Sequence, residues 1–239
     1  MAQPFTQWTV LPHGEVAQID DNVLTVVGDI RMPLMNLPRR MTVVRLADSR
    51  LLVWSAIALD EDEMASLEAY GHPAYLIVPS DKHRLDARIW KHRYPSLLVV
   101  APEGARAKVE SIVPVDTVAP RFDDTNVEFL TVPGTRGCEA ALVVRTPNGT
   151  TLVLNDIVGN IRNESGLGGW LLRLAGFAGK QAQIPRVVKM AMIADSNALR
   201  AQLLRWAEIQ SLTRILVSHG SPIEGDVRET LRDLARSLG

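Results

Sequence analysis

The chain has 239 residues, 46% of them hydrophobic and 22% charged, which is the composition of a soluble globular protein with room for one large domain. Its formal net charge of −1 gives no electrostatic argument for binding nucleic acid or an anionic membrane, and its single cysteine excludes an internal disulfide and a cysteine-rich zinc site. No stretch reaches the roughly 20 apolar residues that cross a bilayer, and no secretory signal pattern is present, so we expect a cytoplasmic protein.

The first half of the chain has the pattern of short strands followed by a strand–helix–strand unit. Runs rich in apolar and β-branched residues alternate with turn residues, and apolar residues at helical spacing interrupt them twice. Two strands separated by a helix indicate a parallel crossover. The predicted strands are 22–27, 41–46, 51–54, 75–78 and 97–101, and the predicted helices are 60–70 and 83–93.

The second half repeats this arrangement and ends in helices. Residues 147–149 read Pro-Asn-Gly, which favours a tight turn between two antiparallel strands. An apolar, glycine-rich stretch at 166–179 predicts a helix that covers a site, joins two copies of the chain or belongs to the core. Membrane association is a further alternative, although the apolar run is short and interrupted by glycine. The predicted strands are 127–132, 140–145, 151–155 and 215–218, and the predicted helices are 195–210 and 227–238. No linker divides the chain, so we expect one domain over residues 1–239.

Two of these strands end at residues that can bind a metal ion. The strand before Asp156 and the strand before His219 are both apolar runs that stop at a polar side chain. Ligands in α/β proteins tend to lie beyond the carboxyl ends of strands, and both a carboxylate and an imidazole suit zinc, iron or manganese. Local sequence therefore indicates a metal site to which other parts of the chain must add ligands.

This layout resembles the metallo-β-lactamase fold superfamily, an uncharacterised bacterial branch with altered metal motifs. The resemblance covers nearly the whole chain, from the strands near Asn22 to the last helix. The loop after strand 75–78 reads Val-Pro-Ser-Asp-Lys-His-Arg-Leu-Asp, where the superfamily has His-x-His-x-Asp-His. Val132-Pro-Gly-Thr-Arg-Gly carries Thr135 in place of a further metal-binding histidine. The resemblance implies an α+β fold, the four-layer αββα sandwich, with Asp156 and His219 matching the superfamily's late metal ligands.

The resemblance implies a metal-dependent hydrolase with a reduced, mononuclear site. His83 would join Asp156 and His219 as metal ligands, although His83 also has the position of a residue at a helix N-terminus. Asp81 or Glu139 would be the catalytic base. For Asp81 we favour the role of helix N-cap, with an oxygen ligand of the metal as the alternative. Glu139 could instead complete the metal coordination or orient one of the metal ligands. The expected cofactor is one divalent ion, zinc before iron or manganese.

The loss of most superfamily ligands supports a rival hypothesis. The scaffold would then be a metal-free binding or interaction module, in which Asp156 and His219 keep a structural hydrogen bond. For the enzyme we expect a small-molecule substrate of unknown identity, and no nucleic-acid or membrane partner. A homodimer contact through the region from Trp170 to Phe177 is one of the roles open to that stretch.

Overall fold

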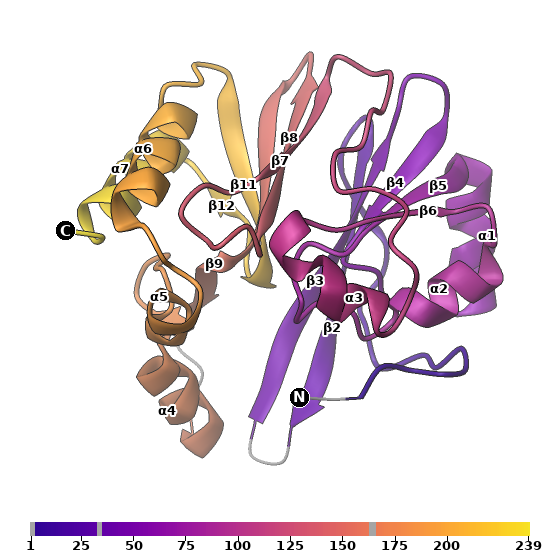
Figure 1. Cartoon of the computed structure of the whole chain (residues 1–239), viewed down its shortest axis with the longest axis horizontal. Helices are drawn as coiled ribbons and strands as arrows, with labels where there is room; N and C mark the ends of the chain where they lie inside the picture. The colour runs from indigo at the N-terminus through magenta and orange to yellow at the C-terminus, as the bar shows by residue number, and fades with distance from the viewer. Residues whose placement is uncertain (1–2, 33–34, 163–165) are drawn as a thin grey trace.

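The computed structural model describes residues 3–32, 35–162 and 166–239. Within these residues the strands form two six-stranded sheets that face each other, with helices on both outer faces (Figure 1). Helices α1, α2 and α3 cover one sheet, and α6 and α7 cover the other. The architecture is therefore the expected αββα sandwich of the α+β class.

The first sheet is built by the N-terminal half of the chain. Its strands follow one another in chain order, antiparallel from β1 to β4 and parallel from β4 to β6. The parallel pairing of β5 with β6 across α2 confirms the predicted crossover. The strands are β1 (Ala17–Asp20), β2 (Val23–Met32), β3 (Met35–Arg45), β4 (Arg50–Trp54), β5 (His72–Ile77) and β6 (Leu98–Val100).

The second sheet has the order β12-β11-β9-β8-β7, with β10 paired to β9. The predicted turn at 147–149 is confirmed, because Thr146 pairs with Gly149 where β8 and β9 meet. Strands β9 and β11 are parallel. The strands are β7 (Val127–Thr131), β8 (Ala140–Thr146), β9 (Gly149–Arg162), β10 (Ala178–Gly179), β11 (Leu212–Gly220) and β12 (Ile223–Glu224).

Apolar side chains fill three layers of this sandwich. Trp54, Ile77 and Leu142 belong to the buried cluster between the two sheets. A second cluster joins the first sheet to its helices, and a third joins the other sheet to α5, α6 and α7. The helices are α1 (Glu61–Tyr70), α2 (Ala87–Arg93), η1 (Glu103–Ala105), α3 (Arg106–Glu110), α4 (Gly166–Ala175), α5 (Arg186–Ala191), α6 (Ser196–Ala207) and α7 (Val227–Arg236).

Two element boundaries differ from the sequence-based expectations in ways that affect the site. Strand β9 continues to Arg162 and does not stop before Asp156. Helix α2 begins at Ala87, so His83 lies in the loop before it. The Asp86 side chain makes no cap, because its carboxylate pairs with Arg39 and accepts the backbone N–H of Ala58 at 3.1 Å. Among the helices of the described residues, none is both long and apolar enough to cross a membrane.

Candidate metal centre

Asp156 lies in a bulge of β9. In the pairing of β9 with β11, Val217 is opposite Leu154 and His219 is opposite Gly159. One residue of β11 therefore faces four of β9, and the extra residues break the regular alternation of side chains. Bulges of this kind redirect side chains and are common beside active sites. The bulge positions the Asp156 carboxylate at the edge where the two sheets meet, although the strand itself continues.

His219 is the penultimate residue of β11, and its ring is fixed from both sides. Its Nδ1 atom lies 2.6 Å from the backbone oxygen of Pro38 in β3 of the opposite sheet. Phe177 packs edge-on against the ring, with the centroids 5.6 Å apart. Gly220 follows with a φ of +113°, and a Cβ there would lie 2.2 Å from the Asn160 oxygen. The close approach of β9 thus requires glycine directly after His219.

His83 reaches the same point from the loop between β5 and α2. Its backbone N–H donates to the Ser80 carbonyl at 3.3 Å, which turns the loop back on itself. The Nδ1 atom lies 2.8 Å from the hydroxyl oxygen of Ser55, the residue after β4. Ser55 has a φ of +53°, and its backbone N–H donates to Ile77. The two strand ends β4 and β5 therefore hold the His83 ring in one orientation.

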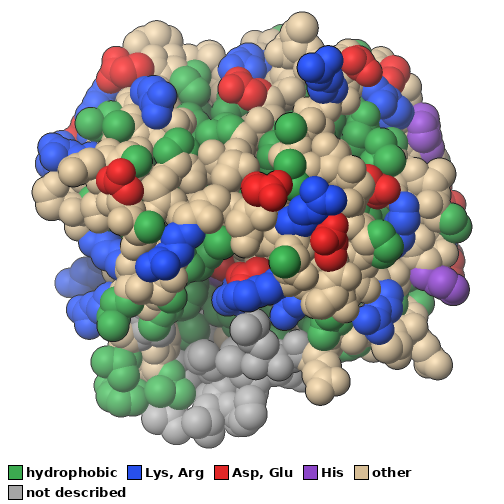
Figure 2. Space-filling view, in the orientation of Figure 1, with side chains coloured by type: hydrophobic (Ala, Val, Ile, Leu, Met, Phe, Trp, Pro, Cys, Tyr) green, Lys and Arg blue, Asp and Glu red, His purple; other side chains and the backbone are tan. Residues whose placement is uncertain are grey.

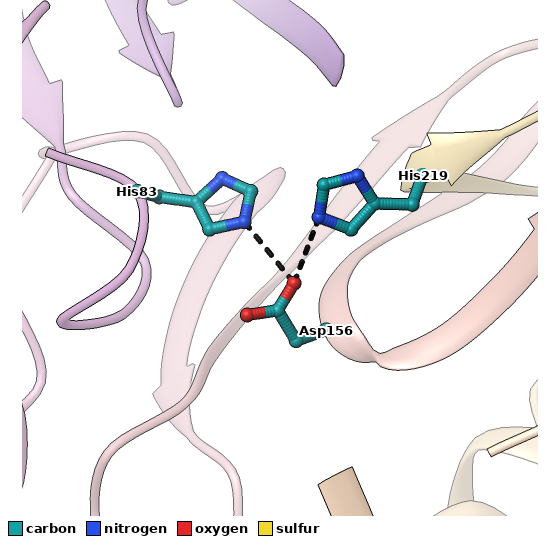
Figure 3. Close-up of side chains that lie close together, drawn as sticks. All are labelled: His83, Asp156 and His219. Carbon is teal, nitrogen blue, oxygen red and sulfur yellow. Dashed lines mark hydrogen bonds and ion pairs between the residues drawn. The ribbon is translucent and has the colours of Figure 1, made fainter. Parts of the chain in front are cut away.

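These three side chains converge on one point (Figure 3). The Nε2 atoms of His83 and His219 lie 3.1 and 3.0 Å from the same oxygen, Oδ1 of Asp156. All three potential ligand atoms lie within 4.8 Å of one another, and each side chain is at most 7% exposed. Two ligands of a tetrahedral zinc ion with bonds of about 2.0–2.1 Å lie about 3.3 Å apart. The two nitrogen–oxygen distances are close to this value, so the three side chains could hold one small metal ion.

The electrostatics of the cluster favour a positive charge between its members. Burial acts to raise the pKa of Asp156, but the charge of His83 and hydrogen bonds from both imidazoles outweigh it and hold that pKa well below its ordinary range. Burial acts to lower the pKa of His219, and the hydrogen bond and charge of Asp156 outweigh it, so this pKa is raised. The ionised carboxylate can therefore pair with a protonated imidazole or with a metal ion.

Glu139 lies behind Asp156 and is completely buried. Its two carboxylate oxygens accept the backbone N–H of Asp156 at 3.1 Å and the Asn155 amide at 3.2 Å. Asn155 also bonds to Ser80 and Ser218, so the network joins the loop before α2 to β9 and β11. Burial, and next the charge of Asp156, raise the pKa of Glu139 well above its ordinary value. Glu139 therefore contacts the backbone of Asp156, and its role toward a metal ion stays a prediction.

The expectation that Asp81 is the N-cap of α2 is wrong, because Asp86 holds that position. Its carboxylate pairs with the ammonium groups of Lys82 at 2.7 Å and Lys108 at 2.6 Å. Burial acts to raise the pKa of Asp81, and these two lysines outweigh it and lower the pKa. Asp81 as a proton acceptor stays a prediction.

Sequence analysis missed the residues that orient the two histidines. Ser55 had one local signal, its place directly after a predicted strand, and Pro38 acts through a backbone carbonyl that any residue would supply. Phe177 was part of the predicted apolar stretch, and its contact with His219 places the end of that stretch beside the cluster. Thr135, which stands where the superfamily has a histidine, bonds to the Val132 carbonyl at 2.7 Å and lies outside the three-residue cluster.

No protein-family model and no curated protein matches this sequence. Solved structures do match its fold. The mono-zinc form of the metallo-β-lactamase FIM-1 from Pseudomonas aeruginosa has a TM-score of 0.62 and 11% identity, covering 95% of this chain and 96% of that one. The metallo-β-lactamase DIM-1, exposed to ceftazidime, has a TM-score of 0.63 and 12% identity, covering 97% and 100%.

A third match is a metallo-β-lactamase from Erythrobacter litoralis with β-mercaptoethanol in its active site. Its TM-score is 0.62 at 13% identity, and the match covers 96% of this chain and all of that one. Identities this low establish the backbone arrangement and leave the chemistry open. The chain therefore has the metallo-β-lactamase fold.

Proposed function

We propose that this protein is a metal-dependent hydrolase with a mononuclear site formed by His83, Asp156 and His219. The observation that supports it is the convergence of two imidazole nitrogens on one carboxylate oxygen at 3.0 and 3.1 Å. The similar structures are metallo-β-lactamases, and one of them is described as a mono-zinc form. Zinc is the expected ion, with iron and manganese as alternatives. A cytoplasmic location and a small-molecule substrate stay predictions from the sequence.

The chain's own residues prepare the site for a divalent ion. Ser55 and the Pro38 carbonyl hold the Nδ1 atoms of His83 and His219, which leaves both Nε2 atoms directed at the centre. Contacts of this kind around metal-binding histidines fix the ring orientation and raise ligand basicity. Three protein ligands are the usual number in catalytic zinc sites, where the ion acts as a Lewis acid and lowers the pKa of a bound water toward neutrality.

The base that accepts a proton in hydrolysis would be Asp81 or Glu139. Glu139 has the raised pKa, but its oxygens are engaged by Asn155 and the backbone of Asp156 on the buried side of the cluster. Asp81 is ionised and is held between two ammonium groups. The oxygens of both carboxylates are therefore engaged, and the lowered pKa of Asp81 weakens it as a base. The contacts of Glu139 favour a positioning role for it, and Asp81 as the base stays a prediction.

A metal-free binding module is the second candidate, and one observation favours it. Asp156 already accepts hydrogen bonds from both imidazoles, so the three buried side chains satisfy one another without an ion. On this hypothesis the cluster stabilises the junction of the two sheets. The region around it would bind a partner or ligand without catalysing a reaction.

Metal content separates the two candidates. Protein purified without chelators would be analysed by inductively coupled plasma mass spectrometry, before and after incubation with zinc, iron and manganese salts. The hydrolase proposal predicts about one ion per chain, lost in His219→Ala and retained in His92→Ala, whose histidine is exposed on α2. Wild-type protein that stays metal-free after incubation would contradict the hydrolase proposal and support the binding module.

A further inference from the structure

Helices α4 and α5 carry large apolar side chains that the protein does not bury. Trp170 and Leu174 on α4 are 52% and 55% exposed, and Val187 and Met190 on α5 are 46% and 85% exposed. In contrast, Leu172 of α4 is fully buried against Ile161 and Ala178. Helix α4 is therefore anchored by Leu172, while Trp170 and Leu174 face outward. Contiguous exposed apolar surface of this kind marks an interaction site.

The end of α4 lies against the start of α5. Gly176, which follows α4, has a φ of +82°, and a Cβ there would lie 2.6 Å from the backbone nitrogen of Arg186. The end of α4 therefore touches the start of α5. In Figure 2, hydrophobic side chains gather with basic ones at the lower left, where Figure 1 places α4 and α5. We define Trp170, Leu174, Val187 and Met190 with the basic residues around them as the α4–α5 surface.

The charge of this segment differs sharply from that of the whole chain. Residues 166–194 contain four basic side chains and no Asp or Glu, although the chain has 26 basic and 27 acidic residues. The net charge of −1 thus hides a local excess of positive charge. Lys180 and Arg186 are exposed in the loop and at the first turn of α5. The four basic residues are Arg173, Lys180, Arg186 and Lys189.

We propose that the α4–α5 surface docks on a membrane that contains anionic phospholipids. Exposed Trp, Leu and Met beside Lys and Arg are the combination that places a helix in the lipid interface, where apolar side chains enter the acyl boundary and basic ones meet the headgroups. Residues 166–194 contain no carboxylate, although Glu164 and Asp195 flank them in the sequence, so the segment itself adds no repulsion toward an anionic surface. This proposal is independent of whether His83, Asp156 and His219 bind a metal.

The same charges argue against a second copy of the chain as the occupant. A two-fold dimer brings identical patches together, so the exposed Lys180 and Arg186 of one copy would add to the positive charge of the other. Like charges placed opposite each other across an interface oppose association. An anionic lipid surface instead satisfies both the apolar and the basic side chains. The surface also adjoins the candidate metal centre, because Phe177 follows α4 and packs against His219.

Co-sedimentation with vesicles tests the proposal on the full chain. Vesicles of phosphatidylcholine with phosphatidylglycerol would be compared with phosphatidylcholine alone, at low and high salt. We expect binding to the anionic vesicles that weakens as salt screens the basic residues. Lys180→Gln with Arg186→Gln, and separately Trp170→Ser with Met190→Ser, should each weaken binding by about tenfold or more. The matched control, Leu204→Ser with Arg205→Gln on α6, should bind as the wild type does.

Tryptophan fluorescence gives a second readout from the docked surface itself. Trp54, Trp90 and Trp206 are at most 3% exposed and Trp8 is partly buried, so Trp170 is the side chain that a membrane would move from water. A blue shift with anionic vesicles, absent in Trp170→Phe, supports docking. Failure of the wild type to bind anionic vesicles, or equal binding by all variants, overturns it. The proposal is also overturned if the protein forms a dimer that does not bind vesicles and that Trp170→Ser with Met190→Ser dissociates. That result would favour self-association.

Discussion

The Nδ1 atom of His219 lies 2.6 Å from the backbone oxygen of Pro38, and this contact joins the two sheets beside the candidate metal centre. A carbonyl oxygen only accepts hydrogen bonds, so Nδ1 must carry the hydrogen. The Nε2 atom, 3.0 Å from Asp156, is then the nitrogen left to bind a metal ion. A backbone contact from β3 thus selects the tautomer that the proposed function needs.

This contact predicts the tautomer of His219 in zinc-loaded protein. We expect ¹⁵N-detected NMR of labelled histidine to show hydrogen on Nδ1 of His219 and none on Nε2. His219→Ala identifies the resonance. A signal with hydrogen on Nε2 and a bare Nδ1 would contradict both the Pro38 contact and the assignment of Nε2 as a ligand.

Ser55 should tune metal affinity without being a ligand. Removal of its hydroxyl in Ser55→Ala leaves the His83 Nδ1 atom without its partner at 2.8 Å and frees the ring to rotate. Loss of such a contact typically weakens metal binding about 10–100-fold. Zinc affinity would be measured by competition with a chelator, with Ser66→Ala on the exposed face of α1 as the control. Unchanged affinity in Ser55→Ala would exclude an orienting role for Ser55.

Gly220 should tolerate substitution far less well than Gly225, although both have positive φ. Alanine at Gly220 meets the Asn160 oxygen at 2.2 Å in addition to its backbone strain, whereas a Cβ at Gly225 has no atom within 4 Å. Gly225→Ala should cost about 1 kcal/mol of unfolding free energy from the backbone alone. Gly220→Ala should cost several times as much and should displace His219. Urea denaturation measures both, and equal losses would show that β9 does not constrain this turn.

The buried ion pair of Arg39 and Asp86 should be sensitive to loss of one partner. Both side chains are at most 5% exposed, and the pair links β3 to the residue before α2. Asp86→Asn leaves the Arg39 guanidinium buried without its counter-ion, and the expected loss is about 3–5 kcal/mol of unfolding free energy. Joint replacement as Arg39→Met with Asp86→Leu should recover much of this loss. A double variant as unstable as Asp86→Asn would mean that packing, and not the charge, makes this site sensitive.

Asp20 should give stability that depends on pH. Burial acts to raise its pKa, but hydrogen bonds from Asn148, Thr146 and the Asp21 backbone outweigh it and lower the pKa below 3.8. A lowered pKa in the folded state means that this stability is present above pH 3.8 and is lost as the pH falls through the folded pKa.

The corresponding test compares Asp20→Asn with the wild type by urea denaturation across acid pH. The variant should be less stable by up to about 1 kcal/mol at pH 7, and the difference should shrink toward zero at low pH. Asp29→Asn on β2 serves as the control for removing one carboxylate. If the difference in unfolding free energy between wild type and Asp20→Asn stays constant with pH, the contacts of Asp20 with Thr146 and Asn148 are stabilising through packing and not through its charge.

The sequence alone indicated most of the strands and helices, because hydrophobic periodicity is a local property, and the superfamily resemblance implied the αββα sandwich. Runs such as 75–78 and 97–101 form buried strands wherever they pack, and the strand–helix–strand order between them requires parallel pairing. His83, Asp156 and His219 were predicted from strand-end positions and from the superfamily resemblance. Their residue types restrict the chemistry to metal binding or to hydrogen bonding, and sequence could not choose between these.

Only the tertiary structure decided how the site is built. The bulge that positions Asp156 depends on the pairing of β9 with β11, and the orientation of His219 depends on a carbonyl 181 residues away in the chain. Asp86 reads as an ordinary first-turn residue of α2, yet burial beside Arg39 gives it an ion pair instead. Local sequence fixes which segments form strands and helices. Contacts between distant segments determine which side chains meet, because they arise only when the two sheets pack together.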